Sequence, residues 1–227
     1  MKALVTGSAG GIGRAIVTRL EADGYDVTGV DVDELDVSDP RAWAAAELPR
    51  LDVACLNAGV VSGSAAIEDL ADDVYRRAVG VNVDGVVFGV RALVPLLEPG
   101  GKIVVTASLA GLTELASDPV YAGTKHFVVG FVRSLAPQLA ERGIVINAVC
   151  PGIVDTPMIA GSRAALEAAG FPLLAPEDVA DAVAAILASD GTGEAWVVQP
   201  GRAPEPFRFR GVPGPRTPGA EGVRPPL

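Results

Sequence analysis

A glycine-rich turn near the start of the chain constrains the fold most strongly. The segment 5–13, VTGSAGGIG, follows the apolar run 3–5 and precedes a helical pattern at Ile16, Val17 and Leu20. Glycine adopts positive φ and has no Cβ, so the backbone N–H groups of such a turn can approach a pyrophosphate at the helix N-terminus. The spacing of the glycines is G-x-x-x-G-x-G, which differs from the G-x-G-x-x-G fingerprint of dinucleotide-binding turns. A tight strand-to-helix turn that binds no ligand is therefore the alternative interpretation. The candidate phosphate-binding residues are Gly7, Gly11, Ile12 and Gly13.

The rest of the chain alternates short apolar runs with amphipathic segments, which is typical of a parallel sheet covered by helices. The expected strands are 2–6, 26–30, 52–56, 102–107, 144–149 and 194–199, and the expected helices are 14–23, 41–48, 68–97, 121–141 and 176–189. The length of 227 residues suits one such unit. We therefore predict a single α/β domain over residues 1–200, a Rossmann-like, doubly wound parallel sheet, followed by an extended tail over 201–227.

Composition and charge exclude several classes of function. The formal net charge of −10 argues against a nucleic-acid partner, because phosphates would be repelled. Cys55 and Cys150 lie in apolar runs, as core residues do, and His126 is the single histidine, so neither a metal site nor a Ser-His-Asp triad is expected. No signal peptide precedes the first strand, and Arg91 and Pro95 interrupt the apolar stretch 86–97. The default expectation is a soluble cytoplasmic protein without a membrane partner.

An aspartate at the end of the second expected strand bears on the choice of cofactor. Asp31 follows the glycine turn by about 18 residues, where a dinucleotide fold places the carboxylate that binds the adenosine ribose. A carboxylate would repel the 2′-phosphate of NADP, and Asp33 adds to that repulsion. The sequence therefore favours NAD over NADP, although a single aspartate is often only a solvated loop residue.

Small and polar residues follow the other expected strands. They are Asn57-Ala58-Gly59, Ser108 and Pro151-Gly152, at the edge of a parallel sheet that carries ligands. Each of them alone would also suit an ordinary loop.

Tyr121 and Lys125 share one helical face through their i, i+4 spacing, and a pair with this spacing is also common in surface packing.

Taken in order, these motifs resemble the short-chain dehydrogenase/reductase family, in its single-domain branch. The resemblance covers residues 2–200, and each motif is weak, but six of them in one order make a specific match. The residues that carry it are Thr6-Gly7-x-x-x-Gly11-Ile12-Gly13, Asn57-Ala58-Gly59, Asn82, Ser108, Tyr121-x-x-x-Lys125 and Pro151-Gly152-x-x-x-Thr156.

The resemblance implies oxidation of a secondary alcohol, or reduction of a ketone, by hydride transfer with NAD. Tyr121 is the expected general acid/base, and Lys125 is expected to lower the pKa of its phenol, which is ordinarily ~10. Lys125 is also expected to hold the nicotinamide ribose. Ser108 is expected to orient the substrate oxygen, and Asn82 to support a water that relays protons to Lys125.

Further cofactor contacts are implied on both sides of the site. Thr156 and the main chain near Ile153 resemble the residues that contact the carboxamide, and Asp36 and Val37 resemble the pair that flanks adenine. We expect the substrate to enter over an apolar flap, 156–176, with Val60, Leu109 and Glu114 as candidate pocket walls. The long helices 68–97 and 121–141 would pair between subunits, which implies a homodimer or homotetramer.

The chain departs from the family in two places. Only residues 32–35 separate Asp31 from Asp36, and a parallel crossover needs a dozen or more residues. We therefore predict that one crossover helix is missing and that the edge strand next to the strand 26–30 is vestigial. Six substantial parallel strands would remain, and the adenine side would be more open. The tail carries five arginines against two glutamates, so it could dock on the acidic body through Phe207 and Phe209 or stay solvated. The shortened adenine side motivates one rival from another class, a non-catalytic NAD(H) sensor or scaffold.

Overall fold

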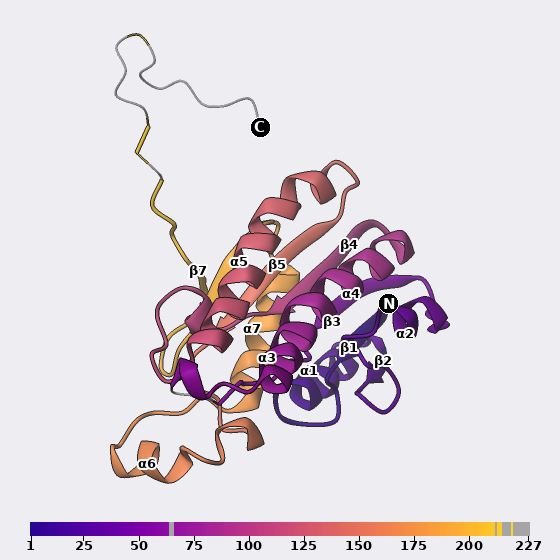
Figure 1. The fold of residues 1–227 in the computed structure, drawn as a ribbon. Helices are drawn as coiled ribbons and strands as arrows, with labels where there is room; N and C mark the ends of the chain where they lie inside the picture. Colours follow the sequence, from indigo (N-terminus) through magenta and orange to yellow (C-terminus); the bar gives the residue numbers. More distant parts are fainter. Residues whose placement is uncertain (64–65, 212, 215–218, 220–227) are drawn as a thin grey trace.

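The protein folds around one seven-stranded sheet (Figure 1). The computed structural model describes residues 1–63, 66–211, 213–214 and 219. The strand order is β2-β1-β3-β4-β5-β6-β7, in which the first six strands are parallel and β7 is antiparallel to β6. The strands are β1 (Lys2–Thr6), β2 (Asp26–Val30), β3 (Leu51–Leu56), β4 (Leu97–Thr106), β5 (Val145–Pro151), β6 (Ala195–Val198) and β7 (Glu205–Pro206).

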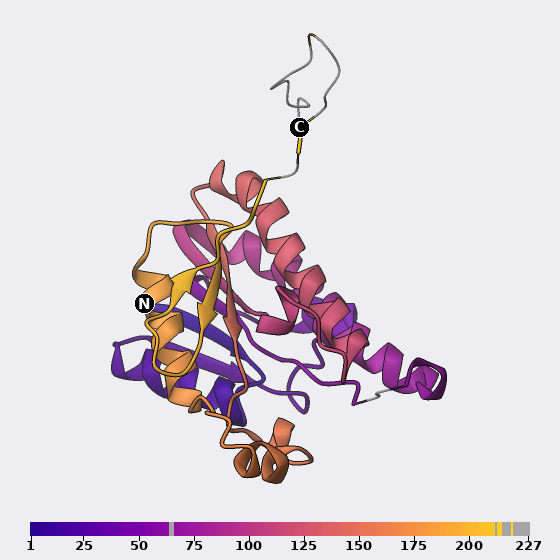
Figure 2. The ribbon, with the colours of Figure 1, turned by 90° about the vertical axis from the view of Figure 1, so that its left-hand side faces the viewer.

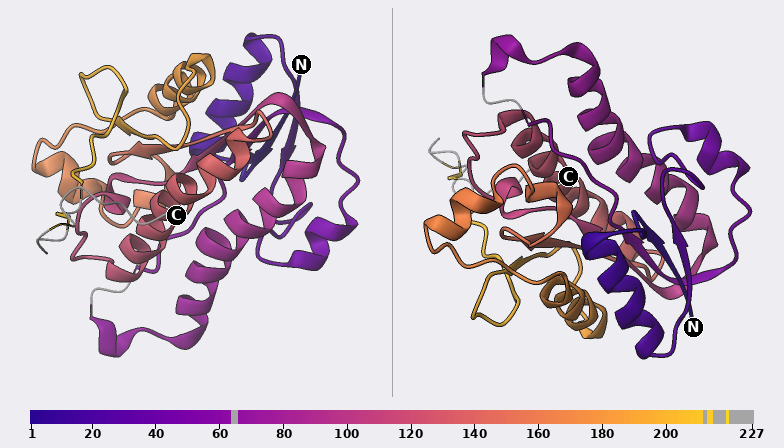
Figure 3. Two further views of the ribbon diagram at one scale, coloured as in Figure 1. Left: turned by 90° about the horizontal axis from the view of Figure 1, so that it is seen from above. Right: turned by 90° about the horizontal axis from the view of Figure 1, so that it is seen from below.

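Helices cover both faces of the sheet (Figures 2 and 3). On one face, Ile16 and Val183 pack with Val5 in one buried apolar cluster, and on the other face Trp43 and Val128 pack with Leu4 in a second cluster. This is the doubly wound α/β arrangement that the sequence predicts. The helices are α1 (Gly11–Ala22), α2 (Pro40–Ala45), α3 (Asp72–Val79), α4 (Gly85–Leu93), α5 (Pro119–Ala140), α6 (Arg163–Ala168) and α7 (Pro176–Ala188).

The strand order places a topological switch point between β1 and β3. From β1 the chain moves outward to β2, and it then returns to β3 on the other side of β1. The loops that leave β1 and β3 therefore diverge at the carboxyl ends of these strands, where open α/β sheets bind their ligands. The glycine turn and Asn57-Ala58-Gly59 lie on these two loops.

The predicted loss of a crossover helix is confirmed for the described part of the chain. Residues 31–39 connect β2 to α2 without a helix or strand, and β2 is the edge of the sheet. Leu35 and Val37 from this connection are buried, and the Trp43 indole N–H donates to the carbonyl oxygen of Val37 at 3.0 Å. Asp39 caps α2 by accepting a hydrogen bond from the backbone N–H of Arg41. The short connection is thus held by packing and by one buried hydrogen bond.

The long helical region predicted over 68–97 is confirmed from Asp72 to Leu96, although it is not one uniform α-helix. The segment consists of a 3-10 turn at Ile67–Asp69, then α3, a π-helical segment at Gly80–Asp84, α4 and a 3-10 turn at Val94–Leu96. Ala71 has extended backbone angles, so the α-helix begins only at Asp72. The following strand also begins earlier than predicted, because Leu97 already pairs with Leu51.

The described part of the tail is docked on the body of the protein. The backbone N–H of Phe207 donates to the carbonyl oxygen of Ala195 at 2.7 Å, and the Arg133 guanidinium lies 3.6 Å from the ring centroid of Phe209. The sequence predicts an extended tail, which this part is, but not the short strand β7. Residues 212, 215–218 and 220–227 of the predicted tail lie outside the described residues.

One helical stretch in the described part of the chain, Asp72–Leu96, is long and apolar enough by length and composition to cross a membrane. The core helix of a soluble protein passes the same test. Val86, Val90 and Leu93 of this stretch are buried in the core cluster that also contains Leu56 of β3.

Candidate active site

The backbone of the glycine turn is packed so tightly that a residue with a Cβ would be strained at three of its glycines, Gly7, Gly11 and Gly13. Gly7 and Gly11 have φ of +65° and +49°, in the left-handed region that favours glycine. A Cβ on Gly13 would lie 1.9 Å from the carbonyl oxygen of Gly7, closer than any real contact. Helix α1 begins at Gly11, so its first backbone N–H groups face this turn without helical partners.

Polar side chains fasten the turn to the next strand. The Asn57 amide donates to the carbonyl oxygens of Thr6 and Gly7 at 3.2 and 3.3 Å. The Thr6 hydroxyl oxygen accepts from the backbone N–H groups of Asn57 and Ala58 at 3.0 and 3.1 Å. Asn57 therefore shapes the glycine turn, a role that the sequence argument missed, as it missed the contribution of Thr6.

Asp31 lies beside the glycine turn, at the end of β2. Its carboxylate accepts from the backbone N–H of Ala9 at 2.9 Å and of Val32 at 2.8 Å. Asp36 is exposed, and one of its oxygens accepts from both the backbone N–H and the hydroxyl of Ser38. The structure thus places the two predicted adenosine-side acids in one connection, 31–39.

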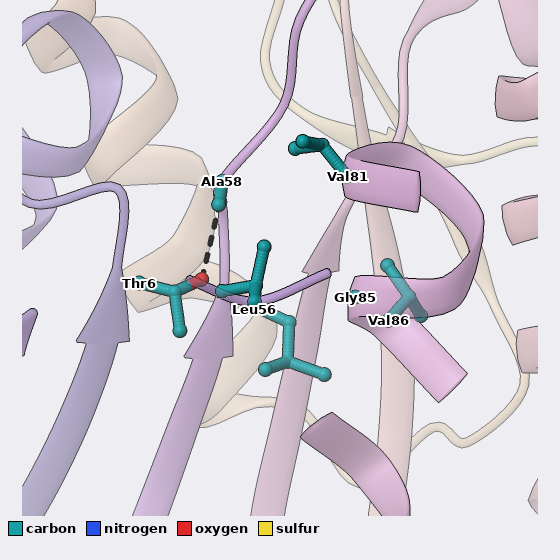
Figure 4. A pocket seen from close by; sticks show the side chains of 7 residues that line it. Thr6, Leu56, Ala58, Val81, Gly85 and Val86 are labelled. Carbon is teal, nitrogen blue, oxygen red and sulfur yellow. Dashed lines mark hydrogen bonds between the residues drawn. The ribbon is translucent and has the colours of Figure 1, made fainter. Parts of the chain in front are cut away.

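An apolar hollow lies between the ends of β1 and β3 and the π-helical segment (Figure 4). Figure 4 shows Thr6, Leu56 and Ala58 on the sheet side, facing Val81 and Val86. Its remaining lining residues are Val37 and Gly85.

Ser108, Tyr121 and Lys125 are brought together at the carboxyl ends of β4 and β5. The Ser108 side chain acts on the Tyr121 phenol, whose pKa it lowers, and Ser108 Oγ accepts from the backbone N–H of Ala110 at 3.1 Å. The Lys125 ammonium lies 5.6 Å from the ring centroid of Tyr121 and donates to the carbonyl oxygen of Thr106 at 2.8 Å. Lys125 is buried, with 3% of its surface exposed. Two titratable groups and a hydroxyl therefore share one largely desolvated corner.

Burial perturbs both titratable groups in this corner. Burial raises the pKa of the Tyr121 phenol, and the Ser108 side chain acts in the opposite direction by lowering it. Burial also lowers the pKa of Lys125 to about 8. The expected lowering of the Tyr121 pKa is therefore wrong, because the net shift is upward. Desolvation disfavours the charged forms of both side chains, and the group that opposes it at Tyr121 is Ser108.

Asn82 lies in the π-helical segment and is fully buried. Its side chain is bonded to both backbone groups of Val60, at 2.8 Å each, and donates to the Thr124 hydroxyl at 3.0 Å. A Cβ on Gly59 would lie 3.3 Å from Lys125 Nζ and 3.4 Å from Asn82 Oδ1. Gly59, Asn82 and Lys125 therefore surround one small space.

The loop after β5 approaches the glycine turn from the other side. A Cβ on Gly11 would lie 3.0 Å from the methyl carbon of Thr156. Pro151 ends β5, Gly152 donates its backbone N–H to Val198, and Ile153 accepts a hydrogen bond from Leu174 at the base of the flap. Glu114 is exposed and accepts a hydrogen bond from Thr113.

Asp118 is a further site residue that the sequence argument missed. It is buried, caps α5 and accepts hydrogen bonds from Ser62, Gly63 and Tyr121. The signal was available, because Asp118-Pro119 repeats the cap pattern of Asp39-Pro40. His126 bonds the Ala122 carbonyl oxygen on its own helix.

Comparisons with known proteins agree with this architecture. The family model described as short chain dehydrogenase matches residues 30–167. Cyclohexanol dehydrogenase from Acinetobacter sp. strain SE19 is 32% identical over 231 aligned positions, which cover 86% of this chain and 92% of that protein. The family model begins at residue 30, so it does not include the glycine turn.

Solved structures show the same fold with either cofactor. A short chain dehydrogenase from Burkholderia cenocepacia J2315 in complex with NADP is 29% identical, with a TM-score of 0.77 over 86% of this chain and 95% of that one. A 3-ketoacyl-(acyl-carrier-protein) reductase from Brucella melitensis complexed with NADH is 28% identical, with a TM-score of 0.78 over 88% and 97%. This chain belongs to the short-chain dehydrogenase/reductase family of oxidoreductases.

Proposed function

We propose that this protein is an NAD(H)-dependent oxidoreductase that interconverts a secondary alcohol and a ketone. The observation that carries the proposal is the grouping of Ser108, Tyr121 and Lys125. The Ser108 hydroxyl acts on a partly buried phenol that lies beside a buried ammonium, at the same sheet edge as the glycine turn. A protein that only bound a nucleotide would not need these proton-transfer groups.

The glycine turn fits a dinucleotide, because α1 begins at Gly11 without a side-chain cap, and the N–H groups of its first turn have no partners within the helix. When bound, the nicotinamide ring would accept the hydride in oxidation and supply it in reduction. We propose that Asp31 binds the adenosine ribose and that Lys125, with Tyr121, binds the nicotinamide ribose. The further proposed contacts are Gly7, Gly11, Ile12 and Gly13 for the pyrophosphate, Asp36 and Val37 for adenine, Asn57, Ala58 and Gly59 along the cleft, and Pro151, Gly152, Ile153 and Thr156 for the carboxamide.

Proton transfer falls to the residues of the chain itself. In alcohol oxidation, Tyr121 Oη takes the proton of the substrate hydroxyl, and in ketone reduction it returns that proton to the carbonyl oxygen. Ser108 Oγ orients the same substrate oxygen. The ammonium of Lys125 lies beside the Tyr121 ring, and Asn82 supports the water through which Lys125 exchanges protons with solvent.

The direct test of the reaction uses NAD and cyclohexanol, the alcohol in the name of the Acinetobacter relative. Larger secondary alcohols are tested next. We expect NADH to form, as measured by its absorbance, and the ketone to be detected in equal amount. The protein could instead bind NADH tightly, form no NADH from any alcohol in the series and oxidise no NADH with the matching ketones. That result would favour the non-catalytic sensor or scaffold.

The cofactor preference is tested by replacing Asp31. We expect Asp31→Asn to weaken NADH binding about tenfold, because asparagine has one acceptor oxygen for the ribose hydroxyls where aspartate has two. We expect it to strengthen NADPH binding by a similar factor, because it removes a negative charge that repels the 2′-phosphate. Fluorescence titration with each cofactor measures both constants. Asp33→Asn is the matched control, since Asp33 lies in the same turn without a hydrogen bond to the glycine turn, and it should leave NADH binding unchanged. Equal effects of the two variants on NADH would contradict the role of Asp31.

We further propose a cytoplasmic homodimer or homotetramer that buries the outer faces of α4 and α5. Phe127 on α5 stacks on Phe131 at 5.6 Å between ring centroids, and 40% of its surface is exposed in the single chain. Mass measurement in solution decides between monomer and oligomer.

In the proposed division of the chain, residues 1–200 form the cofactor-binding domain and 201–227 form the tail.

A further inference from the structure

The buried carboxylate of Asp118 joins two segments that flank the candidate active site. Its Oδ1 accepts from the backbone N–H of Tyr121 at 3.0 Å and from the Ser62 hydroxyl. Its Oδ2 accepts from the backbone N–H groups of Ser62 and Gly63, at 2.9 Å each. Asp118 is 6% exposed and makes no ion pair among the described residues. Four donors therefore stabilise a charge that burial alone would disfavour.

These bonds are part of a closed ring. Val60 is bonded through both backbone groups to Asn82, and Asn82 donates to the Thr124 hydroxyl. Thr124 in turn donates to the carbonyl oxygen of Tyr121 at 2.7 Å. The residue that carries the phenol is thus held through its N–H by Asp118 and through its carbonyl by Thr124. The loop 60–63 is held by the same two partners, Asp118 directly and Thr124 through Asn82.

We propose that Asp118 is a positioning residue that fixes the loop 60–63 against the first turn of α5 and thereby sets the position of Tyr121 relative to the substrate side of the site. The proposal rests on the proposed function, in which Tyr121 transfers the proton. A helix cap needs one acceptor oxygen, and a serine or an asparagine would supply it. The second oxygen of Asp118 has its partners on the loop 60–63, which is outside the helix.

The charge of Asp118 also acts on Tyr121. The carboxylate raises the pKa of the phenol, in the same direction as burial and Cys150 and against the Ser108 side chain. Lys125 is the cation that faces the ring. Removal of the carboxylate should therefore lower the Tyr121 pKa, an effect that loss of a structural cap alone would not produce.

The experiment compares Asp118→Asn with Asp39→Asn. Both replace an aspartate that caps a helix whose first residue is proline, but Asp39 belongs to α2 and contacts neither Tyr121 nor the loop 60–63. An asparagine keeps the oxygen that accepts from Tyr121 and the Ser62 hydroxyl, but its amide NH2 cannot accept from the backbone N–H groups of Ser62 and Gly63. We expect amide hydrogen exchange at Ser62 and Gly63 to accelerate about tenfold or more in Asp118→Asn and to stay unchanged in Asp39→Asn.

The titration of Tyr121 supplies a second readout without substrate or cofactor. The chain has three tyrosines, so subtracting the phenolate absorbance of a Tyr121→Phe protein isolates this residue. We expect its midpoint to fall in Asp118→Asn, because the carboxylate that raises the Tyr121 pKa is removed. An unchanged midpoint and unchanged exchange at 62–63 would overturn the proposal. A Tyr121→Phe protein with full turnover would instead overturn the proposed function, so the two failures are distinguishable.

Ser62→Ala keeps the proposal testable if Asp118→Asn does not fold. It removes one bond to Asp118 Oδ1 but keeps the carboxylate and the cap of α5. We expect the KM for cyclohexanol to rise about threefold or more while the Tyr121 midpoint and the dissociation constant of NADH stay the same. An unchanged KM would contradict the anchoring of the loop.

Discussion

Replacing Tyr121 with phenylalanine is expected to lower turnover about a thousandfold, because it removes the group that transfers the substrate proton. The Tyr121 side chain is partly buried beside Lys125, and phenylalanine keeps the ring and its packing while removing only the oxygen. The loss should therefore fall on kcat, with the dissociation constant of NADH little changed. Steady-state rates with NAD and cyclohexanol, together with a fluorescence titration, separate the two effects.

Tyr75→Phe is the matched control for this variant. Tyr75 lies on α3 with 48% of its surface exposed, so the same chemical change is made outside the candidate site. Its turnover should stay within about twofold of the unchanged protein. Full activity in Tyr121→Phe, or an equal loss in both variants, would contradict the proposed role of Tyr121 as general acid/base.

Replacing Gly13 with alanine is expected to weaken the binding of NADH about a hundredfold or more. The added Cβ would lie 1.9 Å from the Gly7 carbonyl oxygen and 2.8 Å from Asn57 Nδ2. Neither atom belongs to a flexible chain end, since Gly7 lies in the turn and Asn57 is tied to Thr6. The turn must therefore open, which moves the N–H groups at the start of α1 away from the position proposed for the pyrophosphate.

Gly10→Ala tests whether position within the turn decides this outcome. A Cβ on Gly10 meets only the end of the Arg14 side chain, at 4.0 Å, and its φ of −152° is open to any residue. Binding of NADH should stay within about threefold of the unchanged protein, and circular dichroism should show both variants folded. If both variants bound NADH equally well, the proposed phosphate site would be contradicted.

The sequence predicted the fold well where local signals and tertiary packing agree. The strands Lys2–Thr6 and Asp26–Val30 have the predicted bounds, since each is short and ends at a turn. The missing crossover could be predicted because four residues cannot span a parallel connection. The π-helical segment at Gly80–Asp84 was not predicted. Its Asn82 is bonded to Val60, 22 residues away in the sequence, and local periodicity carries no information about such a contact.

The members of the candidate site were predicted, but its electrostatics were not. Spacing on a helix placed Tyr121 and Lys125 on one face, as the structure has them. Spacing carries no information about burial, and burial raises the pKa of Tyr121 and lowers that of Lys125. Asp118 was missed for a related reason, since its partners Ser62 and Gly63 are 56 and 55 residues away.

The central claim is that the shortened adenosine side still forms a working NAD site. The measurement that tests it most directly is a fluorescence titration of the unmodified protein with NADH and, in parallel, with NADPH. The account predicts saturable binding of NADH at concentrations well below millimolar and binding of NADPH at least about tenfold weaker, because of the carboxylate of Asp31. Binding of neither cofactor at millimolar concentration, or tighter binding of NADPH than of NADH, would contradict it.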